Sequence, residues 1–339
     1  MAVAGRIFGP EWRRYSDPAT EFEVIRLTDS AFSSGFTAPW LRQFTRRGEL
    51  LYWSDRTGSR QPFLMNLRSG ESRQIAEAAA LDPRSLCLAG DDRGFVFLDG
   101  DALRYGSLIS SHARELYKLR PGASLAALTS GANGALFLAE RLNGRTRIVT
   151  EVQDATRVVR DFSLDVQVLM ARPRHSQLLY RAGERLAAMN FDGSGGRDLR
   201  IAPGRTGEAA WVPSGRTFVY LHVPENAKEL ITLREYGPDD NSDKLIARTS
   251  QFESVAPNLD ASVFVGASRS KASAYVLLLV RAVRRELALC EHHASDASMV
   301  SPLFSPDSQS VFFVSDRHGK PALYRVHVER FVQETDDGQ

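Results

Sequence analysis

The segment SPLFSPDSQSVFFVSDRHGKPALYRVHVER, residues 301–330, has the pattern of three short β-strands joined by tight turns. Its β-branched and aromatic run, Val311–Val314, lies between two turn segments, Pro306–Ser308 and Asp316–Gly319, and Ala322–Val328 alternates beyond them. Asp and Gly suit such hairpins, because Asp side chains bond to nearby backbone N–H groups and Gly accepts positive φ. We therefore expect an antiparallel sheet here.

A similar segment lies near the other end of the chain. LLYWSDRTGSRQPFLMNL, Leu50–Leu67, repeats the same order of an apolar run, Ser-Asp-Arg-x-Gly and a second apolar alternation. The two copies are about 260 residues apart. Such a distant copy indicates that one supersecondary unit is repeated through the interval between them.

The repeat is visible in seven turns, each between an entering strand and the next one. They are marked by Arg47, Asp92, Asn133, Arg174, Ser214, Asp260 and Asp307, with spacings of 45, 41, 41, 40, 46 and 47 residues. Propeller blades of four antiparallel strands repeat at roughly 40–50 residues. The sequence therefore predicts an all-β, seven-bladed β-propeller. A six-bladed ring and two stacked β-sandwiches are the alternatives, and the even spacing disfavours the sandwiches.

The last unit has only three strands, so its fourth must come from elsewhere. Residues 22–28, FEVIRLT, alternate apolar and polar side chains as a half-buried strand does. We expect this N-terminal strand to join the last blade and close the ring, which removes exposed sheet edges. The expected organisation is an irregular leader at 1–21, a single propeller domain at 22–330 and a polar C-terminal tail at 331–339.

Composition excludes several classes of partner. The chain has 43 Lys and Arg against 41 Asp and Glu, a net charge of +2, which gives no nucleic-acid footprint. Its longest apolar run, 275–280, is too short to span a bilayer, and the first residues lack the apolar core of a signal peptide. Cys87 and Cys290 lie in strand-like runs and are expected to be buried thiols. We expect a cytoplasmic protein that binds neither nucleic acid nor membranes; the sequence sets no oligomeric state.

Candidate ligand-binding residues follow from the predicted topology. The first strands of a propeller line its central channel, and the loops that enter them form one face where side chains from several blades converge. The residues just before the first strands are therefore the expected ligand contacts at the channel mouth. They are Trp40, Arg42, Glu208, Trp211, Glu253, His292, His293 and Asp296.

The run Glu291–Asp296 is the densest group of potential metal ligands. Imidazole and carboxylate groups suit a divalent metal, but a metal site needs three or four convergent ligands and a single loop does not supply them. We interpret the run as a connector between blades and predict no metal site. The chain also lacks a Walker loop, a G-x-S-x-G elbow and an H-E-x-x-H helix, which favours a binding propeller over an enzyme.

Three segments resemble the oligogalacturonate lyases: residues 10–30, the run FTRRGELLYWSDRTG at 44–58, and residues 301–324. That family consists of cytoplasmic seven-bladed propellers that split unsaturated pectin fragments by β-elimination. The Ser-Asp-Arg-x-Gly core is also shared with TolB-type propeller repeats, whereas the leader and first unit make the likeness to the lyases more specific. The resemblance implies the same fold and the same location for a ligand.

The family's metal site does not carry over to this sequence. In the family, manganese and basic side chains neutralise a uronate carboxylate, and the metal is held by a Gln and two His before the final blade and by a His from the preceding blade. The matching positions here are Asp296, Met299 and Ser301, and residues 253–258 contain no His. A thioether and a hydroxyl cannot replace imidazoles around such an ion.

Three functions therefore remain open. The leading interpretation is a propeller that binds an acidic oligosaccharide or another carboxylated ligand through Arg and aromatic side chains, without catalytic residues or a cofactor. The second is an active lyase on oligogalacturonides with a rearranged site, and only then would manganese be expected. The third is a TolB-type protein-interaction propeller.

Overall fold

The computed structural model describes residues 5–90, 92–110, 112–131, 134–152, 155–226, 228–249 and 251–328. Within these residues the strands form seven antiparallel sheets, and the one helix is a short 3-10 helix at Ala297–Met299. The chain divides into two compact units. Unit 1 comprises Met1–Pro10 and Phe36–Leu199, and unit 2 comprises Glu11–Gly35 and Arg200–Gln339. The predicted tail at 331–339 lies outside the described residues.

Unit 1 contains four sheets. In sheet order their strands are β1 (Ile7–Phe8), β7 (Ser72–Gln74), β6 (Gln61–Asn66) and β5 (Glu49–Ser54); β11 (Ala113–Lys118), β10 (Ala102–Ser107), β9 (Gly94–Asp99) and β8 (Leu81–Leu88); β12 (Ser124–Ser130), β13 (Leu136–Leu142), β14 (Arg145–Val152) and β15 (Ala155–Phe162); and β16 (Val166–Ala171), β17 (Gln177–Ala182), β18 (Arg185–Asn190) and β19 (Arg197–Asp198). The strands within each sheet follow one another as local hairpins, except that β1 pairs with β7 in the first sheet.

Unit 2 contains three sheets. In sheet order their strands are β20 (Arg205–Trp211), β21 (Phe218–Val223), β22 (Thr232–Gly237) and β23 (Ser242–Arg248); β24 (Ala256–Pro257), β25 (Val263–Ala267), β26 (Tyr275–Val280) and β27 (Arg285–Glu291); and β2 (Arg13–Ser16), β3 (Glu23–Arg26), β30 (Ala322–His327), β29 (Ser310–Ser315) and β28 (Leu303–Phe304). The short strand β4 (Ser34–Gly35) also belongs to this unit.

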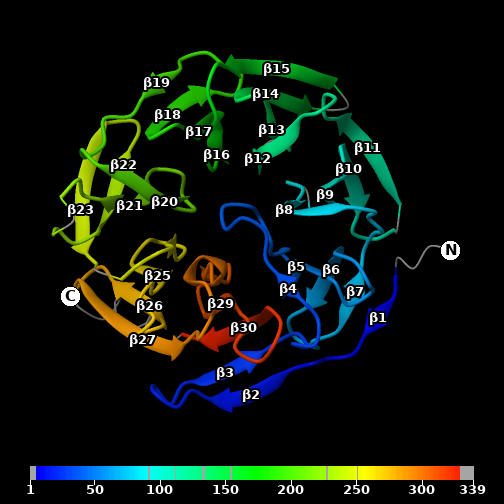
Figure 1. Cartoon of the computed structure of the whole chain (residues 1–339), viewed down its shortest axis with the longest axis vertical. Helices are drawn as coiled ribbons and strands as arrows, with labels where there is room; N and C mark the ends of the chain where they lie inside the picture. Colours follow the sequence, from blue (N-terminus) through cyan, green and yellow to red (C-terminus); the bar gives the residue numbers. More distant parts are fainter. Residues whose placement is uncertain are drawn as a thin grey trace. The chain divides into compact units, whose positions relative to one another are not determined.

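The predicted closing strand is confirmed. β3 pairs antiparallel with β30, with Val24 opposite Val326 and Ile25 opposite Arg325. Figure 1 shows these two strands, blue and red, side by side. Val24 and Ile25 are 0% and 2% exposed, so the N-terminal strand contributes apolar side chains to the core of unit 2.

The expectation of an irregular leader is wrong for two parts of residues 1–21. β1 pairs with β7, and β2 pairs with β3 as an outer strand. Three of the four residues of β2 are exposed, because an edge strand buries little of its surface. A polar segment of this kind lacks the apolar alternation by which a strand is recognised in sequence.

The seven predicted first turns share one backbone feature. A described residue with positive φ lies at the marked position or directly after it in each turn: Gly48, Asp92, Gly134, Arg174, Gly215, Ala261 and Ser308. Asn133 itself lies outside the described residues. Positive φ closes the tight link between a first and a second strand, so the repeat visible in sequence is a repeat of backbone geometry.

The two Ser-Asp-Arg-x-Gly copies also adopt the same turn. Ser54 and Ser315 are 1% and 0% exposed, and each hydroxyl accepts a bond from the N–H two residues further on. Gly58 and Gly319 have φ of 102° and 135°, and each N–H donates to the carbonyl of the Asp three residues before it. The two copies therefore form the same hydrogen-bonded turn, one in each unit.

The interior of both units is built from the alternating apolar side chains of the strands. Cys87 and Cys290 are free and fully buried, as predicted. In the described part of the chain, no helix has both the length and the apolar character that crossing a bilayer requires.

Candidate functional site

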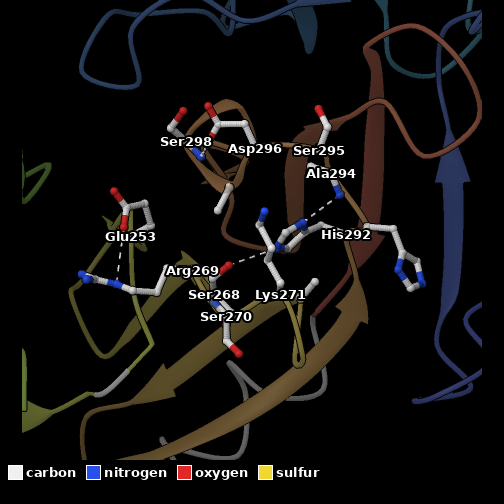
Figure 2. Close-up of a pocket in the computed structure, with 13 residues that line it drawn as sticks. Glu253, Ser268, Arg269, Ser270, Lys271, His292, Ala294, Ser295, Asp296 and Ser298 are labelled. Carbon is white, nitrogen blue, oxygen red and sulfur yellow. Dashed lines mark hydrogen bonds and ion pairs between the residues drawn. The ribbon is translucent and has the colours of Figure 1, made fainter.

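A pocket of about 790 Å³ lies within unit 2 (Figure 2). We call it the unit 2 pocket. Three segments line it: Glu253 before β24, the loop between β25 and β26, and the segment after β27 that ends in the 3-10 helix. Its lining residues are Glu253, Ser268, Arg269, Ser270, Lys271, Ala274, His292, His293, Ala294, Ser295, Asp296, Ala297 and Ser298. Four predicted ligand contacts, Glu253, His292, His293 and Asp296, thus meet in one place.

His292 is held by the backbone on both sides of its ring. Its Nε2 lies 3.1 Å from the carbonyl oxygen of Ser268, and its Nδ1 accepts from the N–H of Ala294 at 3.0 Å. His292 is 2% exposed, and burial lowers the pKa of its imidazole. A neutral imidazole with both nitrogens engaged is neither a metal ligand nor a proton acceptor here. His292 therefore positions the pocket wall.

The other two predicted residues of this segment are exposed and locally paired. His293 Nε2 lies 2.8 Å from Glu291 Oε2. Asp296 caps the 3-10 helix, accepting from the N–H of Ser298 at 2.9 Å, and this bond lowers the pKa of its carboxyl. Asp296 therefore presents a negative charge at the pocket, and Figure 2 shows it on a different side of the pocket from Glu253.

The cationic groups of the pocket come from the loop between β25 and β26, whose residues were not among the predicted ligand contacts. Arg269 Nε lies 3.4 Å from Glu253 Oε2, with both side chains more than 40% exposed. Lys271, two residues further along, is exposed and has no carboxylate partner among the described residues. The polar run Ser268–Ser273, SRSKAS, between two apolar strands is the sequence signal that marks this loop.

Glu208 lies in a β-bulge on β20, beside the segment that carries Glu253. The register with β21 shifts between Thr206 and Ala209, so Gly207 and Glu208 together lie opposite the single residue Leu221. Burial, and to a smaller extent the charge of Glu253, raise the pKa of Glu208 to about 8, although the N–H of Val255 donates to the carboxyl and opposes both. Bulges redirect side chains and are frequent next to functional sites. Glu208 is the strongest candidate for a titrating group at neutral pH.

The remaining predicted residues lie elsewhere. Trp211, at the end of β20, packs edge-on against Phe218 with 5.4 Å between ring centroids, as part of a hairpin. Trp40 and Arg42 line a pocket of about 350 Å³ within unit 1, which we call the unit 1 pocket. Six of the eight predicted contacts therefore line one of two pockets, Glu208 lies beside the first, and Trp211 lines neither.

The fold has solved counterparts. An oligogalacturonate lyase in complex with manganese aligns with a TM-score of 0.90 and 19% identity over 98% of this chain and 100% of its own. An oligogalacturonate lyase from Vibrio parahaemolyticus aligns at 0.89 and 19% identity over 96% and 98%. The fold is a seven-bladed β-propeller. An inactive variant of virginiamycin B lyase from Staphylococcus aureus, in complex with quinupristin, aligns at 0.62 and 10% identity over 94% and 99%.

These comparisons confirm the predicted fold class and its likeness to oligogalacturonate lyases. No family model and no curated protein matches the chain. Because the identities are below 20%, the propeller likeness establishes architecture and leaves the chemistry to the residues of the site.

The residues present do not fit the manganese ligands that the likeness implies. Asp296 caps the 3-10 helix, Met299 ends that helix, and Ser301 follows it with a φ of 37°. Residues 253–258 contain no His, and both ring nitrogens of His292 are engaged by the backbone. Among the described residues, no three His, Cys, Asp or Glu side chains are grouped to hold a metal ion. We therefore derive no chemistry through a metal.

Proposed function

We propose that the propeller binds an acidic oligosaccharide of the uronate type in the unit 2 pocket. Pockets for small ligands span roughly 300–1,000 Å³, and a volume of about 790 Å³ lies well within that range. The likeness in fold to oligogalacturonate lyases supports a uronate as the ligand. A cytoplasmic location, expected from the sequence, belongs to the same proposal.

The observation that carries the proposal is Lys271. It places an ammonium group at a pocket whose other polar side chains are hydroxyls, carboxylates, the imidazoles of His292 and His293, and the paired Arg269. A carboxylate on the ligand would pair with Lys271 and compete with Glu253 for Arg269. The sugar hydroxyls would bond to Ser270, Ser295 and Ser298, which line the same pocket.

Glu208 favours a second candidate, an active lyase acting on the same ligand class. A carboxyl with a pKa near 8 is a stronger proton acceptor than an ordinary glutamate once it ionises. In such a β-elimination, the base would remove the C5 proton next to the uronate carboxylate, a C4–C5 double bond would form as the C4–O bond breaks, and the leaving oxygen would take a proton from water. The lyase and the binding function take the same ligand class and differ only in whether a cleaved product forms.

The test is calorimetric titration with unsaturated digalacturonate, with galactose as the neutral control. The wild-type protein should bind the uronate and ignore galactose. Lys271→Ala should weaken binding about tenfold, since a hydrogen bond to a charged group contributes roughly 1.5–3 kcal/mol. Lys228→Ala removes another exposed lysine of unit 2 that does not line the pocket, and it should bind as the wild type does.

Equal affinity of wild type and Lys271→Ala would overturn the proposed site. Growth of the ultraviolet absorbance of the unsaturated product during incubation would replace the binding candidate with the lyase. In that case Glu208→Gln should abolish product formation while leaving binding in place, because glutamine keeps the shape of the side chain and cannot accept the proton.

A further inference from the structure

The unit 1 pocket concentrates arginine side chains. Arg42 and Arg46 belong to the segment before β5, and Arg172 and Arg174 belong to the turn between β16 and β17. All four line one pocket of about 350 Å³, and none of its described lining residues is acidic. Asp92 lies next to it and pairs with both Arg42 and Arg46. Four guanidinium groups around one pocket give it a strongly positive potential.

Two of these arginines are fixed in place. Arg42 Nη1 donates to the carbonyl oxygens of Ala89 at 3.1 Å and Gly90 at 3.2 Å. Arg172 is 1% exposed, and its Nη1 donates to Gln177 Oε1 at 2.7 Å. Because a guanidinium stays protonated in a protein, a buried one is a permanent positive charge, and an anion nearby stabilises it.

The other two arginines are accessible to a ligand. The side chain of Arg46 is 82% exposed, and its Nε lies 3.3 Å from Asp92 Oδ2. Arg174 is exposed, has a φ of 61°, and has no partner among the described residues. Trp40, on the same lining, has a buried indole N–H without an acceptor in the described part of the chain. A buried donor without an acceptor destabilises the protein, and the oxygen of a bound oxyanion would supply that acceptor.

We propose that the unit 1 pocket is a second anion site, which binds the oxyanion group of a small ligand. The shared chemistry is a carboxylate or phosphate held in bidentate fashion by guanidinium groups. Arg46 and Arg174 contact the anion, while Arg42 and Arg172 supply fixed positive charge. The volume suits one ring bearing a single acidic group. This site does not depend on ligand binding in the unit 2 pocket.

Calorimetric titration of the whole protein tests the site with three probes: galacturonate, inorganic phosphate and neutral galactose. At least one anion should bind, with an affinity that falls as salt rises, and galactose should not. Arg174→Gln and Arg46→Gln should each weaken that binding about tenfold. Arg216→Gln is the matched control, an exposed arginine in the corresponding turn of unit 2 that lines neither pocket.

The two acidic probes distinguish the sources of the anion. Binding of galacturonate alone identifies a sugar acid, and binding of phosphate alone identifies a phosphorylated ligand. Wild-type affinity in both Arg174→Gln and Arg46→Gln would overturn the site. Anion binding that is lost in Lys271→Ala and kept in Arg174→Gln would also overturn it, while supporting the unit 2 pocket.

Discussion

At the scale of single residues, Glu208 makes stability depend on pH. Its carboxyl has an ordinary pKa of 4.5 and a pKa of about 8 in the folded protein. Below pH 4.5 both the folded and unfolded chains hold the proton. Between 4.5 and about 8 the unfolded chain releases it and the folded chain keeps it, so the free energy of unfolding falls as pH rises. Above 8 the loss is complete and constant.

Replacing Glu208 with Gln should remove this dependence. The melting temperatures of wild type and Glu208→Gln should coincide near pH 4, and the variant should become progressively more stable toward pH 8. Glu253→Gln removes the neighbouring negative charge, so it should lower the pKa of Glu208 and flatten the same profile in part. Calorimetry across this pH range measures both. A constant difference between wild type and Glu208→Gln at every pH would contradict the raised pKa.

Position in the repeat predicted some site residues and missed others. Glu253 and Asp296 were found because they precede first strands, and both line the unit 2 pocket. Arg269 and Lys271 were missed because they lie in a loop between second and third strands, which topology gave no reason to inspect. The role of His292 was not predictable from the sequence either. Its ring contacts backbone atoms of Ser268 and Ala294, and only folding brings Ser268 next to it.

At the scale of elements, β25 sets the position of the segment that carries Glu253. A Cβ on Gly266 would lie 2.5 Å from both Phe252 Cδ2 and the carbonyl oxygen of Ser254. Gly266→Ala should therefore push this segment away and destabilise the protein by about 1–3 kcal/mol, as overpacking of a core does. Binding of unsaturated digalacturonate should weaken as well, because Arg269 donates to the carbonyl oxygen of Phe252 and would be displaced with that segment. Denaturant unfolding and calorimetric titration are the two measurements.

Gly9→Ala is the control for that substitution. Gly9 is exposed, has no positive φ, and has open space where a Cβ would lie. It should keep wild-type binding and change stability by less than about 1 kcal/mol, with any change in the stabilising direction. Equal behaviour of Gly266→Ala and Gly9→Ala would show that β25 does not hold the Glu253 segment.

The elements themselves were largely predictable. The first turns combine a regular period with residues suited to positive φ, and both signals are local. β1 and β2 were not predictable, because a short edge strand is defined by its partner and not by its own apolar pattern. The pairing of β3 with β30 was predictable from the number of strands, because the last unit of the repeat has only three and the N-terminal segment supplies one more.

At the scale of the whole molecule, the two ends of the chain fold into one sheet of unit 2. The order β2-β3-β30-β29-β28 makes the N-terminal strands part of a core whose other strands lie about 300 residues away. Without β3, strand β30 would present an open edge, which is a site for aggregation. Ile25, on β3, is 2% exposed, whereas Ile7, on β1, is 60% exposed. Replacing each isoleucine with Ala therefore removes the same side chain from a buried position in one case and from an exposed position in the other.

Ile25→Ala should lower the free energy of unfolding by about 2–5 kcal/mol, the range for a large aliphatic side chain deleted from a core. Ile7→Ala should change it by less than about 0.5 kcal/mol, since it removes exposed surface. Denaturant midpoints measure both, and light scattering during refolding should rise only for Ile25→Ala, because a loosened β3 uncovers the edge of β30. Equal midpoints for the two variants would mean that the N-terminal strand lies on the last sheet without holding it together, and the structural case for closure through both ends of the chain would be lost.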